Sequence, residues 1–227
     1  MPLPASERHP RLGAVRVYFV CDARPRGADP EPLLLAALDG GAGMLELREQ
    51  SAAGDDAGLI DAARPFREAC ATHAVPFILN DRPDLVEQCG ADGVHVGQDD
   101  TPVAEARENL GPEYLIGLST HSAEQIASAC SASPDARPDY ISVGPVWETP
   151  TKEGRPGTGL ELIEYAASEA TLPWFAIGGI DTSNVGDVVA AGAQRIVVVR
   201  ALRDAADPGA AAGALRDALE AGTDVWR

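Results

Sequence analysis

Short apolar segments alternate with stretches of helical periodicity along the whole chain. Eight segments have the composition of strands, and several are unbroken apolar runs, as expected of parallel strands buried on both faces. The predicted strands are 15–20, 44–48, 76–80, 93–97, 115–119, 140–143, 174–177 and 195–199. The pattern therefore predicts a parallel sheet with helices between its strands.

Helix signals fall in the gaps between these strands. Aspartate–proline pairs at 29–30 and 207–208 predict helix starts, because aspartate caps a helix and proline fits its first position. The glycine pair at 40–41 predicts the end of the first of these helices. Ser122 and Gln125 have the spacing of a capping box. The chain thus consists of repeated strand–helix units.

Eight such units without a linker or a break in composition predict one α/β domain. We expect a single (β/α)8 TIM barrel over residues 13–227, after a polar N-terminal tail at 1–12. The alternative is an open, doubly wound sheet. Eight strands, and the lack of a glycine-rich nucleotide turn after the first, favour the barrel.

Composition narrows the range of partners. A net charge of −17 and a pI near 4.5 argue against nucleic acid and anionic membranes. Four scattered cysteines without a C-x-x-C pair favour reduced thiols. No apolar run approaches the roughly 20 residues of a membrane span, and no signal peptide is apparent. We expect a cytoplasmic protein that acts on small molecules, with its oligomeric state open and a homo-oligomer among the options.

The chain has a single lysine among its 18 basic residues, and that lysine lies in the loop after predicted strand 140–143. Lys152 stands beside Thr149 and Thr151. A lysine ammonium is a compact charge that suits a phosphate oxygen. Chance in an arginine-biased composition is the alternative. In a barrel this loop opens at the carboxyl-terminal face, where the active site lies.

Glu46, Arg48 and Gln50 occupy alternate positions along one predicted strand, so they share a side. Leu45 and Leu47 take the other side and would pack under the helices. One interpretation is that Glu46 and Arg48 neutralise each other inside the barrel, because a buried charge is costly unless it is paired. The other is that Arg48 faces an anionic ligand while Glu46 contacts a polar ring.

Asp81 and Asp100 each follow a strand, and the two strands are neighbours. Neighbouring carboxylates raise each other's pKa unless a cation joins them. Mg²⁺ takes one or two protein carboxylates together with substrate phosphate oxygens, which would let an acidic protein hold a diphosphate. The alternative is that both residues cap turns, Asp100 before Pro102 and Asp81 before Pro83.

Glycines after the seventh predicted strand indicate a phosphate site. Gly178 and Gly179 would let backbone N–H groups approach an anion, and Arg200, at the end of the eighth strand, would face the same place. His95 lies within a strand and is expected to be a hydrogen-bonded interior residue. His121 follows a strand beside hydroxyl groups and is the more plausible functional histidine.

Six ordered segments resemble the thiamine phosphate synthase family, over residues from about 18 to 202. They are Leu-Arg-Glu at 47–49, Asn-Asp-Arg at 80–82, Asp-Gly-Val-His-Val-Gly-Gln-Asp-Asp at 92–100, Gly-Leu-Ser-Thr-His-Ser at 117–122, the segment 139–152 and Ala-Ile-Gly-Gly-Ile at 176–180. The resemblance implies a (β/α)8 barrel that joins a hydroxymethylpyrimidine diphosphate to a thiazole phosphate or its carboxylate. The implied products are thiamine phosphate and diphosphate, formed by a dissociative, magnesium-assisted route.

The resemblance also implies roles for individual residues. Asp81 and Asp100 would hold Mg²⁺. The residues implied at the diphosphate are Arg48, Asn80, Ser119 and Lys152, of which Arg48, Ser119 and Lys152 are the candidate catalytic residues. The other implied substrate-binding residues are Glu46 and Gln50 near the pyrimidine diphosphate, and Thr149, Thr151, Gly179, Val199 and Arg200 near the thiazole phosphate.

Three residues depart from the family's usual pattern. Glu46 stands where the family usually has glutamine, Gln50 where it usually has lysine, and Arg200 where it often has serine. Two other functions remain open. A thiazole tautomerase has the same fold and a histidine at the position of His121, but needs no magnesium. A non-catalytic phosphate-binding barrel is the second. The retained Asp81 and Asp100 favour the synthase.

Overall fold

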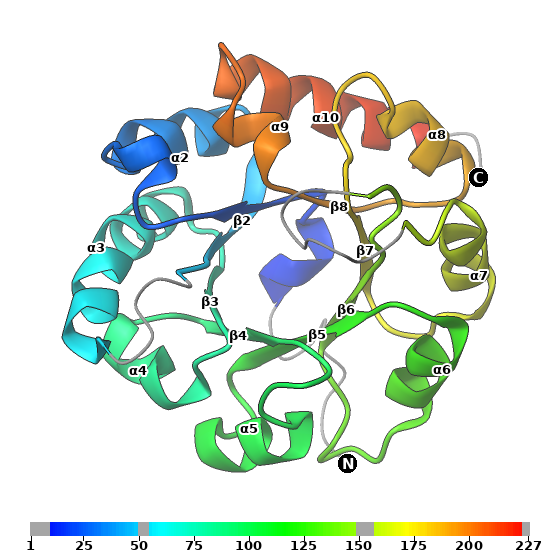
Figure 1. The fold of residues 1–227 in the computed structure, drawn as a ribbon, viewed down its shortest axis with the longest axis horizontal. Helices are drawn as coiled ribbons and strands as arrows, with labels where there is room; N and C mark the ends of the chain where they lie inside the picture. Colours follow the sequence, from blue (N-terminus) through cyan, green and yellow to red (C-terminus); the bar gives the residue numbers. More distant parts are fainter. Residues whose placement is uncertain (1–9, 50–54, 149–156, 224–227) are drawn as a thin grey trace.

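The computed structural model describes residues 10–49, 55–148 and 157–223. Eight parallel strands form a closed barrel in sequence order, β1 to β8, and β8 pairs with β1 through Ile196 and Val17. The strands are β1 (Val17–Cys21), β2 (Ala42–Leu47), β3 (Phe77–Asn80), β4 (Gly93–Val96), β5 (Leu115–Thr120), β6 (Tyr140–Val143), β7 (Trp174–Ile177) and β8 (Ile196–Val198). The predicted (β/α)8 barrel is confirmed, and Figure 1 shows the strands as a ring seen end-on.

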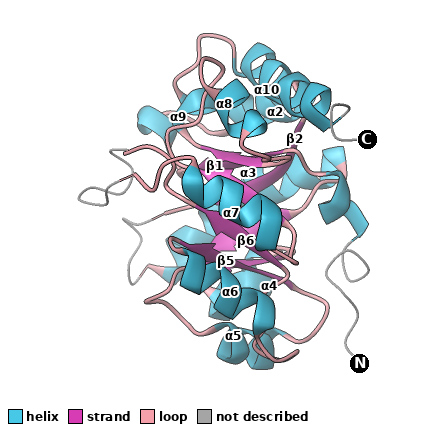
Figure 2. Cartoon of the chain, turned by 90° about the vertical axis from the view of Figure 1, so that its right-hand side faces the viewer, coloured by secondary structure: helices cyan, strands magenta, loops and turns pink. Residues whose placement is uncertain are grey.

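The helices surround this ring, and the side view in Figure 2 shows them enclosing the strands. They are α2 (Glu31–Asp39), α3 (Asp56–His73), α4 (Val86–Cys89), α5 (Val103–Leu110), α6 (Ala123–Ser131), α7 (Glu161–Glu169), α8 (Val185–Ala190), α9 (Arg200–Arg203) and α10 (Pro208–Thr223). Short 3-10 turns lie at η1 (Pro10–Ala14), η2 (Pro25–Gly27) and η3 (Pro83–Leu85). Across the described residues, every helix is too short or too polar to cross a bilayer.

The observed helix caps differ in detail from the predicted ones. Asp207 caps α10 as expected, since its Oδ1 accepts a hydrogen bond from Ala210 N at 2.9 Å. The helix near residue 30 begins at Glu31, one position later than predicted, and Pro30 occupies its N-cap. Asp29 still pairs with one backbone N–H at the start of this helix, because its Oδ1 accepts a hydrogen bond from Glu31 N at 3.1 Å. Proline is tolerated in the first turn because those N–H groups have no intrahelical partner.

Two separate cores stabilise the barrel. The larger lies between strands and helices and includes Leu45, Leu47, Ile141 and Val143. The smaller fills the barrel interior and includes Leu12, from the turn that precedes β1. Leu12 is 1% exposed, so it packs with the barrel although it was assigned to the tail. Above this interior packing, a cavity opens toward the carboxyl ends of the strands.

Candidate active site

A cavity of about 540 Å³ opens at the carboxyl ends of the strands. This volume suits small molecules, since ligand sites typically measure about 300–1,000 Å³. Nine of the predicted site residues line the cavity: Glu46, Arg48, Asn80, Asp81, Asp100, Ser119, Gly179, Val199 and Arg200. The other four, Gln50, Thr149, Thr151 and Lys152, lie outside the described residues. The barrel therefore gathers onto one surface residues that are up to 154 positions apart, from Glu46 to Arg200.

Strand alternation places Glu46 inside the barrel. Leu45 and Leu47 belong to the core under the helices, whereas Glu46 and Arg48 line the cavity, as predicted. Glu46 is 3% exposed, and its Oε2 accepts a hydrogen bond from the hydroxyl of Tyr18 on β1. A carboxylate this deeply buried depends on such donors, because desolvation of a charge is costly.

Two tyrosines extend this polar contact across the barrel interior. The hydroxyls of Tyr18 and Tyr140 lie 3.2 Å apart, and both side chains are fully buried. Burial raises the pKa of the Tyr18 phenol well above its ordinary value, and the negative charge of Glu46 adds to the shift. The same two causes raise the pKa of Tyr140. Both phenols therefore keep their protons and can donate hydrogen bonds.

His95 and Ser119 complete the inner wall. His95 is 7% exposed, with Nδ1 3.3 Å from the Tyr140 hydroxyl and Nε2 3.0 Å from Ser119 Oγ. Ser142 Oγ lies 3.4 Å from the same Nε2. The expectation of a hydrogen-bonded interior histidine is thus confirmed, but the ring also lines the cavity. Its lining position makes it a part of the site that the sequence pattern did not indicate.

Asp81 has an unusual backbone conformation. Its φ is +59°, in the left-handed region that residues other than glycine seldom adopt, and its N–H donates to His95 O at 2.9 Å. Its Oδ1 lies 3.2 Å from Asn80 Nδ2. The N-cap positions of η3 and α5 are occupied by Arg82 and Pro102, so neither Asp81 nor Asp100 stands at the N-cap of the helix that follows it. Backbone strain of this kind occurs often at functional sites.

Asp100 is exposed at the rim of the cavity. Its Oδ2 accepts a hydrogen bond from Gly97 N at 2.8 Å, which holds the loop after β4 against the carboxylate. A Cβ on Gly97 would lie 2.5 Å from that oxygen, so a larger residue there would displace the Asp100 side chain from this contact. The loop therefore fixes where the Asp100 carboxylate lies.

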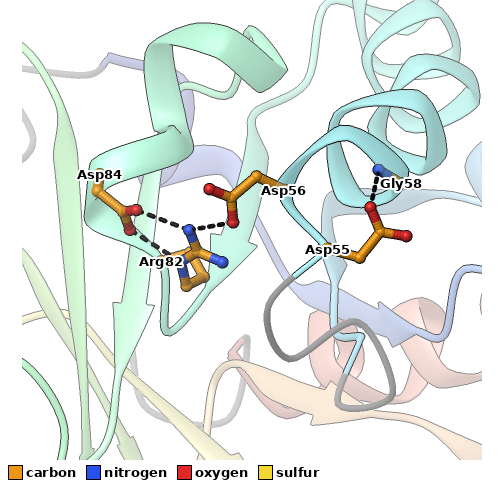
Figure 3. A network of polar contacts seen from close by, with 5 residues as sticks. All are labelled: Asp55, Asp56, Gly58, Arg82 and Asp84. Carbon is orange, nitrogen blue, oxygen red and sulfur yellow. Dashed lines mark hydrogen bonds and ion pairs between the residues drawn. The ribbon is translucent and has the colours of Figure 1, made fainter.

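Arg82 anchors the segment that follows Asp81. Its guanidinium donates to both carboxylate oxygens of Asp84, at 2.9 and 2.7 Å, and to Asp56 Oδ1 at 2.7 Å, as Figure 3 shows. Asp56 is the first residue of α3, so the ion pair between Arg82 and Asp56 joins the turn after β3 to that helix. The hydrogen bond from Arg82 lowers the pKa of the Asp84 carboxyl. These contacts anchor the chain directly after the strained residue.

The opposite wall is formed by the chain after β7 and β8. Gly178 has φ +109° and Gly179 has φ +71°. A Cβ on Gly178 would lie 2.5 Å from Pro145 Cα, so the close approach of two loops requires glycine there. Asn184 Nδ2 donates to Gly179 O at 2.8 Å. With the exposed Arg200, this wall has the amides and positive charge expected of a phosphate site.

His121 also lines the cavity, and its Nδ1 lies 2.6 Å from Gly144 O. A carbonyl oxygen only accepts, so Nδ1 carries a hydrogen. Gln125 Oε1 accepts from His121 N at 2.7 Å, while Ser122 Oγ accepts from Gln125 N at 3.3 Å. The capping residues that start α6 therefore also fix the backbone of His121.

Comparison with known proteins agrees with this arrangement. The family model for thiamine monophosphate synthase matches residues 17–202. This chain belongs to the thiamine monophosphate synthase family. It is accordingly a transferase of thiamine biosynthesis, and the resemblance inferred from the six sequence segments is confirmed.

Individual members of the thiamine monophosphate synthase family are similar over most of the chain. A thiamine-phosphate synthase of Acidothermus cellulolyticus is 46% identical over 203 residues, which cover 88% of this chain and 93% of that relative. One of Nostoc punctiforme is 45% identical over 210 residues, covering 91% of this chain but 56% of the relative. The solved thiamine phosphate pyrophosphorylase of Pyrococcus furiosus has a TM-score of 0.80 at 27% identity, covering 93% of this chain and 98% of that one.

Proposed function

We propose that this transferase joins a hydroxymethylpyrimidine diphosphate to a thiazole phosphate or its carboxylate, and releases thiamine phosphate and diphosphate. The observation that carries the proposal is the division of the cavity into two walls. Arg48, Asn80 and Asp81 lie at the ends of β2 and β3, whereas Gly179 and Arg200 lie after β7 and β8. Two separate places for anions suit two phosphorylated substrates.

Magnesium fits the donor set of the first wall. Asp81 and Asp100 offer carboxylates beside the amide of Asn80, and Mg²⁺ commonly takes one or two carboxylates and completes its shell with water and phosphate oxygens. Within the described residues, no three His, Cys, Asp or Glu side chains form a group that could hold a metal. A metal site with two protein carboxylates, completed by oxygens of the substrate diphosphate, is consistent with this lack of a third protein ligand among the described residues. When bound, the ion would neutralise charge on the leaving group.

The protein's residues would act by positioning and charge. We place breakage of the carbon–oxygen bond to the diphosphate before formation of the carbon–nitrogen bond to the thiazole. Arg48 would donate hydrogen bonds to diphosphate oxygens as they gain negative charge. Val20, Ile177 and Val197 line the cavity with apolar surface and would exclude water from the cationic pyrimidine. The thiazole nitrogen is the nucleophile, so no protein nucleophile is required.

The test is an assay with both substrates, with and without magnesium, that measures thiamine phosphate and released diphosphate. We expect product only when both substrates and magnesium are present. No product in the complete mixture would reject the activity, and full product without magnesium would reject the two-carboxylate site.

A matched pair of variants examines the metal site. Asp100→Asn should raise the magnesium concentration needed for half-maximal activity, because it removes one carboxylate from the cavity. Asp99→Asn removes the same charge from an exposed neighbour outside the set of lining residues, so it should have no such effect. Equal effects of the two substitutions would show that general surface charge is responsible.

A further inference from the structure

A cluster of charged side chains lies at the rim of the cavity, where the chain leaves β1 and β8. These two strands pair with each other, so the segments that follow them are neighbours at the carboxyl-terminal face. We call the five residues the rim cluster: Asp22, which follows β1, Arg26 in η2, Arg200 and Arg203 in α9, and Asp204, which follows α9. Three arginines against two carboxylates give this cluster a net charge of +1, in a chain whose net charge is −17.

Arg203 joins the two carboxylates of the rim cluster. Its Nε and one terminal nitrogen donate to the two oxygens of Asp204, at 2.9 and 3.0 Å, and its other terminal nitrogen donates to Asp22 Oδ2 at 3.4 Å. The hydrogen bonds from Arg203 lower the pKa of the Asp204 carboxyl. Arg203 is therefore the cation that holds both carboxylates.

Arg26 and Arg200 act on Asp204 in a different way. Their charges add to the lowering of the Asp204 pKa, so both guanidinium groups lie in its neighbourhood. Yet among the residues that the structure describes, no hydrogen bond or ion pair joins either of them to a carboxylate. Both side chains are exposed. Because both oxygens of Asp204 are turned toward Arg203, the other two arginines remain available to an anionic ligand.

The backbone of Arg26 is also unusual. Its φ of +55° lies in the left-handed region, which residues with a Cβ seldom adopt. The turn is held by two backbone hydrogen bonds, from Gly27 N to Arg24 O at 2.9 Å and from Ala28 N to Pro25 O at 3.1 Å. Strain at an exposed arginine beside a ligand cavity agrees with a functional position.

The charge of the cavity lining makes such an arginine useful. Histidines aside, seven charged side chains line the cavity, of which two are Arg48 and Arg200 and five are carboxylates: Glu46, Asp81, Asp100, Asp181 and Asp204. A phosphorylated ligand that approaches this lining is repelled wherever a carboxylate has no matching cation. A local positive patch at the mouth offsets the repulsion and raises the concentration of anions there.

We propose that Arg26, together with Arg200, attracts a phosphorylated small molecule to the mouth of the cavity, and that Arg203 keeps Asp22 and Asp204 from neutralising these two arginines. Arg203 is thus a positioning residue. The inference rests on the proposed function for the substrate, which is the thiazole phosphate, because the rim cluster contains Arg200 of the second wall. The attraction acts through charge and away from the reacting atoms, so it changes KM and leaves kcat as it is.

Charge-balanced substitutions at Arg203 and Asp204 test the positioning role. Arg203→Gln should raise KM for the thiazole phosphate about fivefold, whereas Asp204→Asn, which removes a carboxylate from the lining, should lower it about twofold. The double variant has the wild-type net charge, and its KM should return to within about twofold of the wild-type value. A double variant as impaired as Arg203→Gln would mean that displacement of α9 is the cause, and would overturn the proposal.

Substitutions at Arg26 test attraction through charge. Arg26→Gln should raise KM for the thiazole phosphate about two- to fivefold at low ionic strength, and the difference should vanish near about 1 M salt, where the screening length is about 3 Å. Arg26→Lys keeps the charge and should stay close to the wild type. Arg64→Gln removes the same charge from the exposed side of α3 and should have no effect. A lysine variant as poor as Arg26→Gln, or an effect that persists at high salt, would overturn the proposal.

A measurement without substrate separates this inference from the proposed function. We compare how far inorganic phosphate raises the Tm of the wild type and of Arg26→Gln. The general effect of phosphate on stability is common to both proteins, so a larger rise in the wild type reports binding that depends on Arg26. Equal rises would overturn the inference. A larger rise in a wild type that forms no thiamine phosphate would reject the proposed function and leave the attraction of anions by Arg26 standing.

Discussion

The strained backbone of Asp81 allows its structural and chemical roles to be separated by two substitutions. Asp81→Gly and Asp81→Ala both remove the carboxylate and its contact with Asn80 Nδ2. They differ in how well they tolerate the φ of +59°. The left-handed conformation costs a residue with a Cβ about 1–2 kcal/mol, whereas glycine adopts it freely.

The backbone strain and the conformational entropy of glycine together give the expected stabilities of the two variants. Glycine relieves the strain but adds about 0.5–1 kcal/mol of conformational entropy cost, so Asp81→Gly should unfold with nearly the wild-type free energy. Asp81→Ala keeps the strain and loses the local polar contacts that make aspartate tolerable in this region. We therefore expect Asp81→Ala to be less stable than Asp81→Gly by about 1 kcal/mol, or about 2–4 °C in Tm.

The assay combines urea unfolding, followed by circular dichroism, with magnesium-dependent turnover. Both variants should lose activity alike, because both lack the carboxylate. An Asp81→Ala protein as stable as Asp81→Gly would refute the argument from backbone strain. Turnover that survives in either variant would refute the proposed metal contact. The two outcomes are independent, so one half of the reasoning can fail while the other stands.

Three further changes have expected outcomes. Asp139→Ala should cost about 3–5 kcal/mol in urea unfolding, because it leaves the guanidinium of Arg107, 9% exposed in the native protein, without its buried carboxylate partner; a cost below 1 kcal/mol would contradict this. The hydrogen bond that His73 donates to the Asp39 carboxylate raises the pKa of His73, so the stabilisation from this pair is present below about pH 6.5 and is lost as the pH rises through the raised value. Between pH 5.5 and 8 the free energy of unfolding of His73→Gln should therefore fall less than that of the wild type, with a difference within about 1 kcal/mol for such an exposed pair. Lys152→Ala should lower kcat at least tenfold at unchanged Tm, and full activity would reject the role given to the single lysine.

Much of the site could be predicted because, in a barrel, a residue's place at the end of a strand determines which face of the molecule it lies on. Parallel strands all end at one rim, so a polar residue at a strand end, such as Asn80 or Asp81, was expected at the cavity. Strand alternation likewise placed Glu46 inward and Leu47 under the helices, and both predictions are confirmed. The assignments of Gln50 and Lys152 stay predictions, because they lie outside the described residues.

The two tyrosines of the inner wall, Tyr18 and Tyr140, were not predicted as part of the site. Tyr18 and Tyr140 lie within apolar strands, where an aromatic residue usually fills the core, and nothing local distinguishes a tyrosine that also takes part in hydrogen bonding. Alternation offered one signal, since Tyr140 and Ser142 share the face opposite to Ile141 and Val143. Even so, which hydroxyl meets which carboxylate depends on contacts across the barrel.

Local sequence patterns were enough to specify the number and order of the strands, the fold class, the family and the residues at the strand ends. These follow from local periodicity and from short segments that need no partner to be recognised. Only the folded chain decides the left-handed backbone of Asp81, the close approach that requires Gly178, and the hydrogen bonds that link Glu46 to Ser119 across the barrel interior. Each depends on atoms from segments far apart in the chain, such as Tyr18 and Tyr140, which are brought within 3.2 Å only when the barrel closes.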